Sequence, residues 1–507
     1  MDLLIELIGI VDRNKVRSIN IIGDESFSAD TNLDKLYSGI LSGEITTEED
    51  AMKEIGLLRK TKRFHNLKSE LKQRLINTLF FIDVNKPGFT DLSGAYYTCC
   101  RRWVAVKIMF GRGAFNTGMD MAKKLYNKTI EYEFTEISMD IARLLSSQYG
   151  FRYGDRERFD HYNQAYDELA ACFHAENILD RHFSSLVMYR MHKEGREKFL
   201  EVGEELEKEI PAYLDRFDTY RVHLCGRIAL IWCALNAFEY RKTIELCDSG
   251  IAFFREKPYV ANTPMGMFLH YKMICHTQLK EFVRGRETAE FAKTYYEEGT
   301  PNYFKFQESL FILEMHTRHY EKAYIIYDTI TKLKKFKKMD ARARETWLLY
   351  GAFLEYLITI GTLVRPVELA GKSLFRLNRF LNEVPIFNGE KRRRNIPVLI
   401  LQVLFLINRD RYSAAADRIE AVEKYCSRYL KKGSSYRSNC FIKMLLQVPQ
   451  TSFHVEAVKR KASRYFKQLE ANPMEMTNQS WEVEIIPYEE LWEFTLDSLS
   501  PRRITSR

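Results

Sequence analysis

The sequence predicts an all-α protein: an array of about nine antiparallel helical hairpins, with a helical cap before it and a short cap after it. Turn-like stretches recur about every 42 residues from residue 92 onward, and apolar residues between them repeat at helical spacings of three and four. All prolines before the tail are expected in connections or first turns of helices. The predicted turns lie near Gly113, Tyr153, Gly195, Phe238, Phe282, His319, Leu363, Asp410 and Gln450.

The hairpin from Pro301 to Lys338 shows the pattern most plainly. Tyr303, Phe306 and Leu310 begin an apolar stripe before a short polar turn that ends at Lys322. Two helices joined by so short a turn must lie antiparallel, and neither can bury its stripe alone. Each hairpin therefore needs similar neighbours, which is the requirement that a repeat array meets.

Residues 1–90 are predicted to form a separate N-terminal helical domain. Short helices are expected from Asn32, after Thr47 and from Lys62, and Thr47 with Asp50 has the spacing of a capping box. The unit has two possible roles. It can cap the first hairpin of the array, or it can be a helix-turn-helix domain that reads DNA through its basic last helix.

Residues 91–472 are predicted to form the repeat array. In several hairpins a small or polar turn is followed by an aromatic residue and then by an alanine inside the second helix, a pattern that resembles tetratricopeptide-type repeats. The resemblance implies a right-handed α-solenoid and a protein-binding scaffold, and some members of that family are peptide-sensing regulators. The units here are longer than that family's. The residues that carry the resemblance are Arg112-Gly113-Ala114-Phe115 with Ala122, Phe159 with Ala165, Phe282 with Ala289, His319-Tyr320 with Ala323, and Arg411-Tyr412 with Ala415 and Ala416.

Residues 473–507 are predicted to form a C-terminal cap and a tail. Trp481 to Pro487 alternates as a strand does, and Tyr488 to Leu496 has the pattern of a last short helix.

No catalytic motif is present, so we expect no enzyme activity, cofactor or metal. Four histidines lie near acidic residues in predicted helices, but a helical metal site would need Glu-x-x-His pairs, which this cluster lacks. These histidines are His161, His174, His182 and His192.

Membrane insertion is not expected. The apolar run from Trp347 to Val364 is interrupted by Glu355, and the run from Ile396 to Ile407 is too short to cross a bilayer. The nine cysteines include no C-x-x-C pair, which favours a reduced, cytoplasmic protein.

Charge is distributed unevenly along the chain. Residues 321–470 contain 30 Lys and Arg against 14 Asp and Glu, although the whole chain has a net charge of only +9. Many of these cations repeat at helical spacing late in the second helix of successive hairpins, and two lie in a loop between hairpins. They are Lys372, Arg376, Arg379, Arg392, Arg393, Lys424, Arg428, Lys431, Arg460, Arg464 and Lys467.

Three functional hypotheses follow from these features, and an enzyme that uses the region from His161 to His192 is the least favoured of them. The cations form a surface that holds an acidic protein or peptide, or they only complement helix dipoles and keep the chain soluble. Alternatively, the protein is a nucleic-acid-associated or peptide-responsive regulator, which uses Arg59 to Arg63, His65 and Lys68 together with the basic half. The partner's identity, the oligomeric state and the concave face of the array are left open.

Overall fold

The computed structural model describes residues 1–13, 31–84, 91–191, 196–339, 341–365, 395–429, 436–474 and 484–500. Every regular element in these ranges is a helix, so the all-α prediction is confirmed for them. The chain divides into two compact units, Met1–Ala170 and Ala171–Arg507. The domain limits expected from the sequence, after residues 90 and 472, divide the chain differently and remain predictions.

The N-terminal helices share one small core. Leu36, Phe64 and Leu71 are buried in it, and Ile8 of the first helix packs with them. The first helix is thus a fourth member of a unit for which only three helices were predicted. The capping box at Thr47 and Asp50 is confirmed in both directions. These helices are α1 (Asp2–Arg13), α2 (Asn32–Ser42), α3 (Glu48–Glu54) and α4 (Lys62–Leu79).

A second group of helices in this unit packs around Trp103, Leu125 and Ile141. The predicted turns near Gly113 and Tyr153 separate these helices, as expected. The sequence also predicted two helices between the turns near Tyr153 and Gly195, and this prediction is wrong, because one uninterrupted helix occupies the stretch. The helices are α5 (Asp91–Gly111), α6 (Phe115–Glu131), α7 (Thr135–Gln148), the π-helix η1 (Tyr149–Tyr153) and α8 (Arg156–Met191), which continues past the end of the unit.

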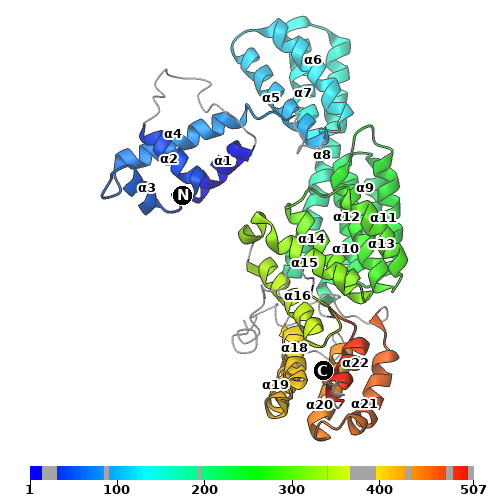
Figure 1. Ribbon diagram of the computed structural model, residues 1–507. Helices are drawn as coiled ribbons and strands as arrows, with labels where there is room; N and C mark the ends of the chain where they lie inside the picture. Colours follow the sequence, from blue (N-terminus) through cyan, green and yellow to red (C-terminus); the bar gives the residue numbers. More distant parts are fainter. Residues whose placement is uncertain are drawn as a thin grey trace. The chain divides into compact units, whose positions relative to one another are not determined.

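In the second unit, helices that follow one another in the sequence pack side by side (Figure 1). This solenoid-like packing agrees with the predicted array. The helices are α9 (Arg196–Arg216), α10 (Tyr220–Asn236), α11 (Tyr240–Arg255), α12 (Asn262–Gln278), α13 (Phe282–Lys293), α14 (Pro301–His316), α15 (Tyr320–Lys332), the 3-10 helix η2 (Lys334–Lys338), α16 (Ala341–Thr359), α18 (Asn395–Asn408), α19 (Tyr412–Tyr429), α20 (Tyr436–Gln450), α21 (Val455–Glu470) and α22 (Tyr488–Leu499).

One kind of turn recurs between these helices. A residue with positive φ follows the helix end, and the next residue donates its N–H to the carbonyl five positions earlier, as in a Schellman motif. In the hairpin turn at Arg318, for example, His319 N lies 3.0 Å from Glu314 O. The positive-φ residues of this turn, in both units, are Gly56, Gly113, Glu133, Phe238, Lys280, Arg318, Gly361, Asp410 and Ser452.

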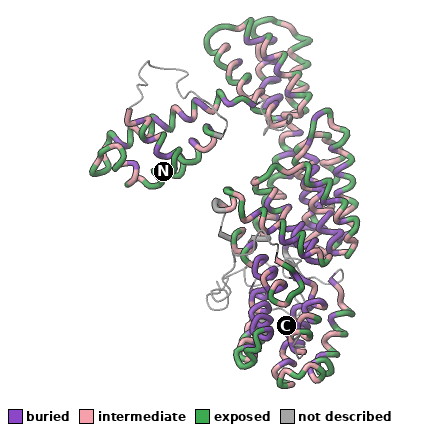
Figure 2. The backbone as a smooth tube through the Cα atoms, in the orientation of Figure 1, coloured by how far each residue is buried: buried purple, intermediate pink, exposed green. Residues whose placement is uncertain are grey.

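A large apolar core runs through the second half of the chain, and the buried positions lie where helices face one another (Figure 2). Phe311, Trp347 and Phe405 are fully buried in it. The C-terminal helix α22 belongs to the same core and packs against α18, α20 and α21. The predicted last helix is therefore confirmed, and it lies across several hairpins.

Two further expectations fail. Pro211 and Pro449 lie inside α9 and α20 instead of in connections or first turns, and each leaves the carbonyl four residues earlier without its helical N–H partner. Of the strand predicted over residues 481–487, residues 481–483 lie outside the described ranges. Residues 484–487 do not form a strand, because Ile485 and Ile486 are both buried and no strand lies in the described ranges to pair with them. None of the described helices is both long and apolar enough to cross a bilayer.

Candidate functional site on the last helical hairpin

The last hairpin, α20 and α21, holds a charged residue in its core. Phe441, Leu445 and Val448 share the buried face of α20, and Arg437 lies one turn earlier on the same face. A charge that loses its water must find partners in the protein, because an unpaired buried charge is strongly destabilising.

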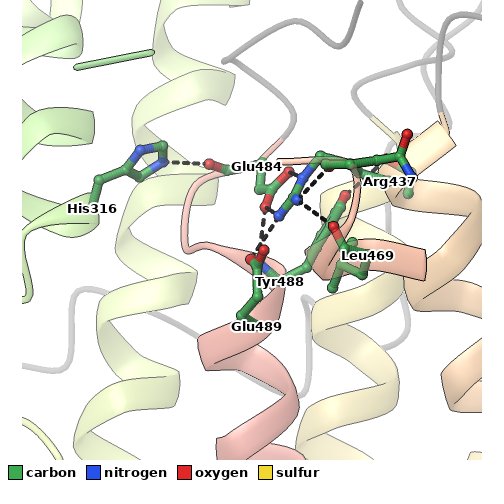
Figure 3. Close-up of polar contacts among 8 residues, drawn as sticks. His316, Arg437, Leu469, Glu484, Tyr488 and Glu489 are labelled. Atoms are coloured by element: carbon green, nitrogen blue, oxygen red, sulfur yellow. Dashed lines mark hydrogen bonds and ion pairs between the residues drawn. The ribbon is translucent and has the colours of Figure 1, made fainter. Parts of the chain in front are cut away.

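Arg437 is 0% exposed and finds these partners in two glutamates and two backbone carbonyls (Figure 3). Its Nη2 lies 2.7 Å from Oε1 of Glu484 and its Nε 3.0 Å from Oε2, while Nη2 also lies 2.6 Å from Oε2 of Glu489. Nη1 donates to the carbonyl oxygens of Leu469 and Asn472, at 3.2 and 2.9 Å. One side chain therefore joins α20, the end of α21 and the C-terminal segment.

Burial and pairing act against each other in this cluster. Burial alone would lower the pKa of Arg437, but Glu484 and Glu489 raise that pKa above its usual value, so the guanidinium stays charged. Burial raises the pKa of the Glu484 carboxyl, and Arg437 opposes that shift. Because each charge depends on the other, the cluster is stable only when both are present.

His316, the last residue of α14, reaches the same cluster from another hairpin (Figure 3). Its Nε2 lies 2.7 Å from the carbonyl oxygen of Glu484. Burial lowers the pKa of His316 to about 4, so the ring is neutral at pH 7. A carbonyl only accepts, and Nε2 therefore carries the proton that it donates.

The turn between α14 and α15 holds two more acidic residues of the C-terminal segment. Arg318 Nε lies 2.9 Å from Oε1 of Glu490, and Arg318 Nη2 lies 3.4 Å from Oε2 of Glu493. The Tyr320 hydroxyl also donates to Glu490. Four of the segment's carboxylates thus face arginines of the array.

Aromatic packing completes this recognition of the C-terminal segment. Residues 484–500 contain five acidic and no basic residues. Tyr488 stacks on Phe441 with 4.7 Å between ring centroids, its hydroxyl lies 2.9 Å from Ser438 Oγ, and Trp492 is buried beside them. The array therefore holds an acidic, amphipathic segment of its own chain by apolar burial and arginine contacts.

The outer side of α21 is basic and faces solvent. We call its four exposed cations, Arg460, Lys461, Arg464 and Lys467, the α21 basic face. Among the described residues no acid pairs with any of them. Glu456 of the same helix pairs with Lys459 at 3.1 Å, and four glutamates of the C-terminal segment pair with Arg437 or Arg318.

An aromatic ring lies within the α21 basic face. The guanidinium of Arg464 is 4.4 Å from the ring centroid of Tyr465, and Lys443 of α20 is 5.8 Å from the same ring. The hairpin 436–470 contains seven basic and two acidic residues, so the positive charge of this surface is not balanced locally.

The structure brings together only part of the predicted basic surface. Arg460, Arg464 and Lys467 lie together on the exposed side of α21, whereas Lys424 on α19 is paired with Glu420 at 2.5 Å. The other predicted residues lie outside the described side chains, so their contribution stays a prediction. These are Lys372, Arg376, Arg379, Arg392, Arg393, Arg428 and Lys431.

The N-terminal basic cluster is partly neutralised. Lys60 and Lys68 both pair with Glu48, which lowers the pKa of that glutamate to about 2 through hydrogen bonds from the two lysines. Fewer charges therefore remain there for a phosphate backbone.

The histidines considered for a metal site do not gather around one point. His161, His174 and His182 lie along the single helix α8, and His192 lies outside the described residues. His182 contacts Glu209 of α9 at 3.3 Å. The described part of the chain contains no group of three or more His, Cys, Asp or Glu side chains that could hold a metal.

The sequence interpretation missed Arg437 and His316. Arg437 had a detectable signal, since it occupies the apolar stripe that continues with Phe441, Met444 and Val448. His316 had none, because its partner Glu484 is 168 residues away in the sequence.

Comparison with protein-family models, curated proteins and solved structures found no match.

Proposed function

We propose that this protein is a non-enzymatic scaffold that binds an acidic partner protein through the α21 basic face. The observation that carries the proposal is the set of four exposed cations on one helix, with no acidic partner among the described residues. Opposite charges across an interface steer association and select partners, and an uncompensated basic surface favours an acidic one.

The C-terminal segment supports the proposal from inside the same chain. It is acidic and amphipathic, and the array holds it through Arg437 and Arg318. An array that recognises one acidic segment in this way has the chemistry to recognise another.

We also propose that the helical array is tetratricopeptide-like. The recurring turn supports this assignment, and so do four of the six alanines of the predicted pattern, whereas Ala165 and Ala416 are only partly buried. Ala122, Ala289, Ala323 and Ala415 are all fully buried at the helix contacts that follow those turns.

The proposal is tested by reversing the charge of the surface. A fluorescently labelled 20-residue polyglutamate peptide is titrated with the native chain and with the triple variant Arg460→Glu, Arg464→Glu, Lys467→Glu. Each exposed charge pair is worth about 0.2–1 kcal/mol, and reversal replaces attraction by repulsion. We therefore expect affinity to fall by about tenfold or more, and native binding to weaken as salt is added.

The matched control is a triple variant that changes the net charge by the same amount, but at three cations that already pair with acids. Lys124, Arg143 and Lys424 are exposed and pair with acids on their own helices. Reversal of these three should change the affinity less than about threefold. Equal losses in both variants would contradict the proposal, and duplex DNA that displaces the peptide at equal charge concentration would favour the nucleic-acid alternative.

A further inference from the structure

A trough of about 580 Å³ lies on α11, α12 and α13, away from the last hairpin. These three helices pack consecutively (Figure 1). Residues of all three line the trough, with α11 and α13 as its walls and α12 as its floor. Ile251 and Leu269 line it and are buried, whereas Phe291 also lines it and is 68% exposed. A large aromatic side chain left in water beside an apolar floor favours a partner that covers it.

The trough has a cation near each end. Arg255 lies in the last turn of α11 and has no acidic partner among the residues that the structure describes. Arg284 lies near the start of α13, and its nearest acid, Glu281, is 3.8 Å away. Glu281 already binds Arg241 at 2.6 Å and His276 at 2.8 Å, so Arg284 has little of its charge neutralised.

The other charges in the trough restrict the partner further. Lys272 pairs across the trough with Asp248 at 2.6 Å, so the centre is close to neutral. Glu287 lies on the α13 wall and disfavours an acid directly opposite it. A complementary partner is therefore acidic toward its two ends and neutral or basic between them.

The length of the trough indicates the form of the partner. The α11 wall extends from Ile244 to Arg255, which is about 16 Å, or roughly three turns of helix. A helix that lies in such a groove inserts apolar side chains at spacings of three and four. The chain's own α22 is held by the same combination of aromatic contacts and arginines.

We propose that this trough binds an amphipathic helix of a partner protein, about three turns long, with large apolar side chains on one face and a carboxylate near each end. The inference rests on the proposed scaffold function and adds to it a second surface and a defined form of ligand. The apolar face would cover Phe291, and the carboxylates would reach Arg255 and Arg284.

The test uses the full-length chain and a labelled synthetic peptide that copies residues 487–500 with the change Glu493→Gln, so that its acids lie near the two ends and its centre is neutral. Fluorescence anisotropy compares the native protein with the variants Phe291→Ser and Arg255→Glu. Both positions are exposed, so the fold should be kept, and circular dichroism checks this. We expect each variant to weaken binding at least fivefold and the double variant at least 25-fold, because the two effects are independent.

Two control experiments locate the binding. The triple variant of the α21 basic face should still bind this peptide, and the variants Phe291→Ser and Arg255→Glu should still bind polyglutamate as the native chain does. Loss of peptide binding only on reversal of the α21 basic face would overturn the trough inference and leave the proposed function standing. Loss of peptide binding in Arg318→Glu would mean that the peptide replaces α22 at its own position, which would also overturn the trough inference. A peptide that does not bind the native chain at all would overturn it too.

Discussion

Replacement of Arg437 by methionine should loosen the C-terminal helix from the array. Methionine keeps much of the length of the arginine side chain but removes five hydrogen bonds, three of them to carboxylates. Glu484, which is 1% exposed, then has a buried carboxylate with no cation beside it.

The expected cost follows from the burial of this pair. Removal of one partner of a buried ion pair costs about 3–5 kcal/mol, because the other charge remains desolvated. Replacement of both partners by apolar residues is much less harmful. The double variant Arg437→Met, Glu484→Leu should therefore be more stable than Arg437→Met alone, by about 2 kcal/mol or more.

Hydrogen exchange measures this effect where it should occur. The amides of Tyr488–Leu499 should exchange about 100- to 3,000-fold faster in Arg437→Met, since 1.4 kcal/mol corresponds to a factor of ten. Arg460→Met, on the exposed side of α21, is the control and should leave these amides unchanged. If Arg437→Met accelerates exchange less than tenfold, or if the double variant is no better than the single one, the assigned role of the pair is wrong.

Three further perturbations have defined outcomes. Burial lowers the pKa of His316 to about 4, so the stability of the contact with α22 is full above about pH 6.5 and falls as the pH drops toward 4. The variant His316→Gln should make the hydrogen exchange of α22 less dependent on pH in this range. Gly250→Ala places a Cβ 2.8 Å from the Phe268 ring and should cost about 1–3 kcal/mol in urea unfolding, whereas no loss would mean that the ring moves aside. Asp50→Ala removes the reciprocal bond to Thr47 and should lower the melting temperature of the N-terminal helices. Because hydrogen bonds from Thr47 and Thr46 lower the pKa of Asp50 to about 2, this stabilisation should disappear as pH falls from 4 toward 2; an unchanged melting temperature would contradict the cap.

The regular part of the fold was predictable because its signals are local. The turns at Gly113, Phe238 and His319 lie between apolar stripes of helical period, and helices end there as expected. The merger of two predicted helices into α8 was not predictable in the same way. A polar stretch within a helix such as α8 resembles a turn in the sequence. Whether the helix ends or continues there depends on tertiary packing, which the sequence does not show.

The exposed part of the candidate site was predictable from the sequence, whereas the partners of its buried residues were not. Arg460, Arg464 and Lys467 follow a helical period that can be read directly from the sequence. The buried contacts between Arg437 and Glu484 join residues 47 positions apart, and no periodic pattern signals such a pair. The strand expected before α22 failed for a related reason, since alternation of side chains does not reveal whether a partner strand exists.

Zero-length crosslinking between lysines and carboxylates tests the central claim most directly. Polyglutamate bound to the native chain is crosslinked with a carbodiimide, and the modified lysines are mapped by mass spectrometry. We expect Lys461 and Lys467 to be modified first, ahead of the exposed but paired Lys124 and Lys424. Crosslinks spread evenly over exposed lysines, or concentrated at Lys124 and Lys424, would contradict a binding surface on α21.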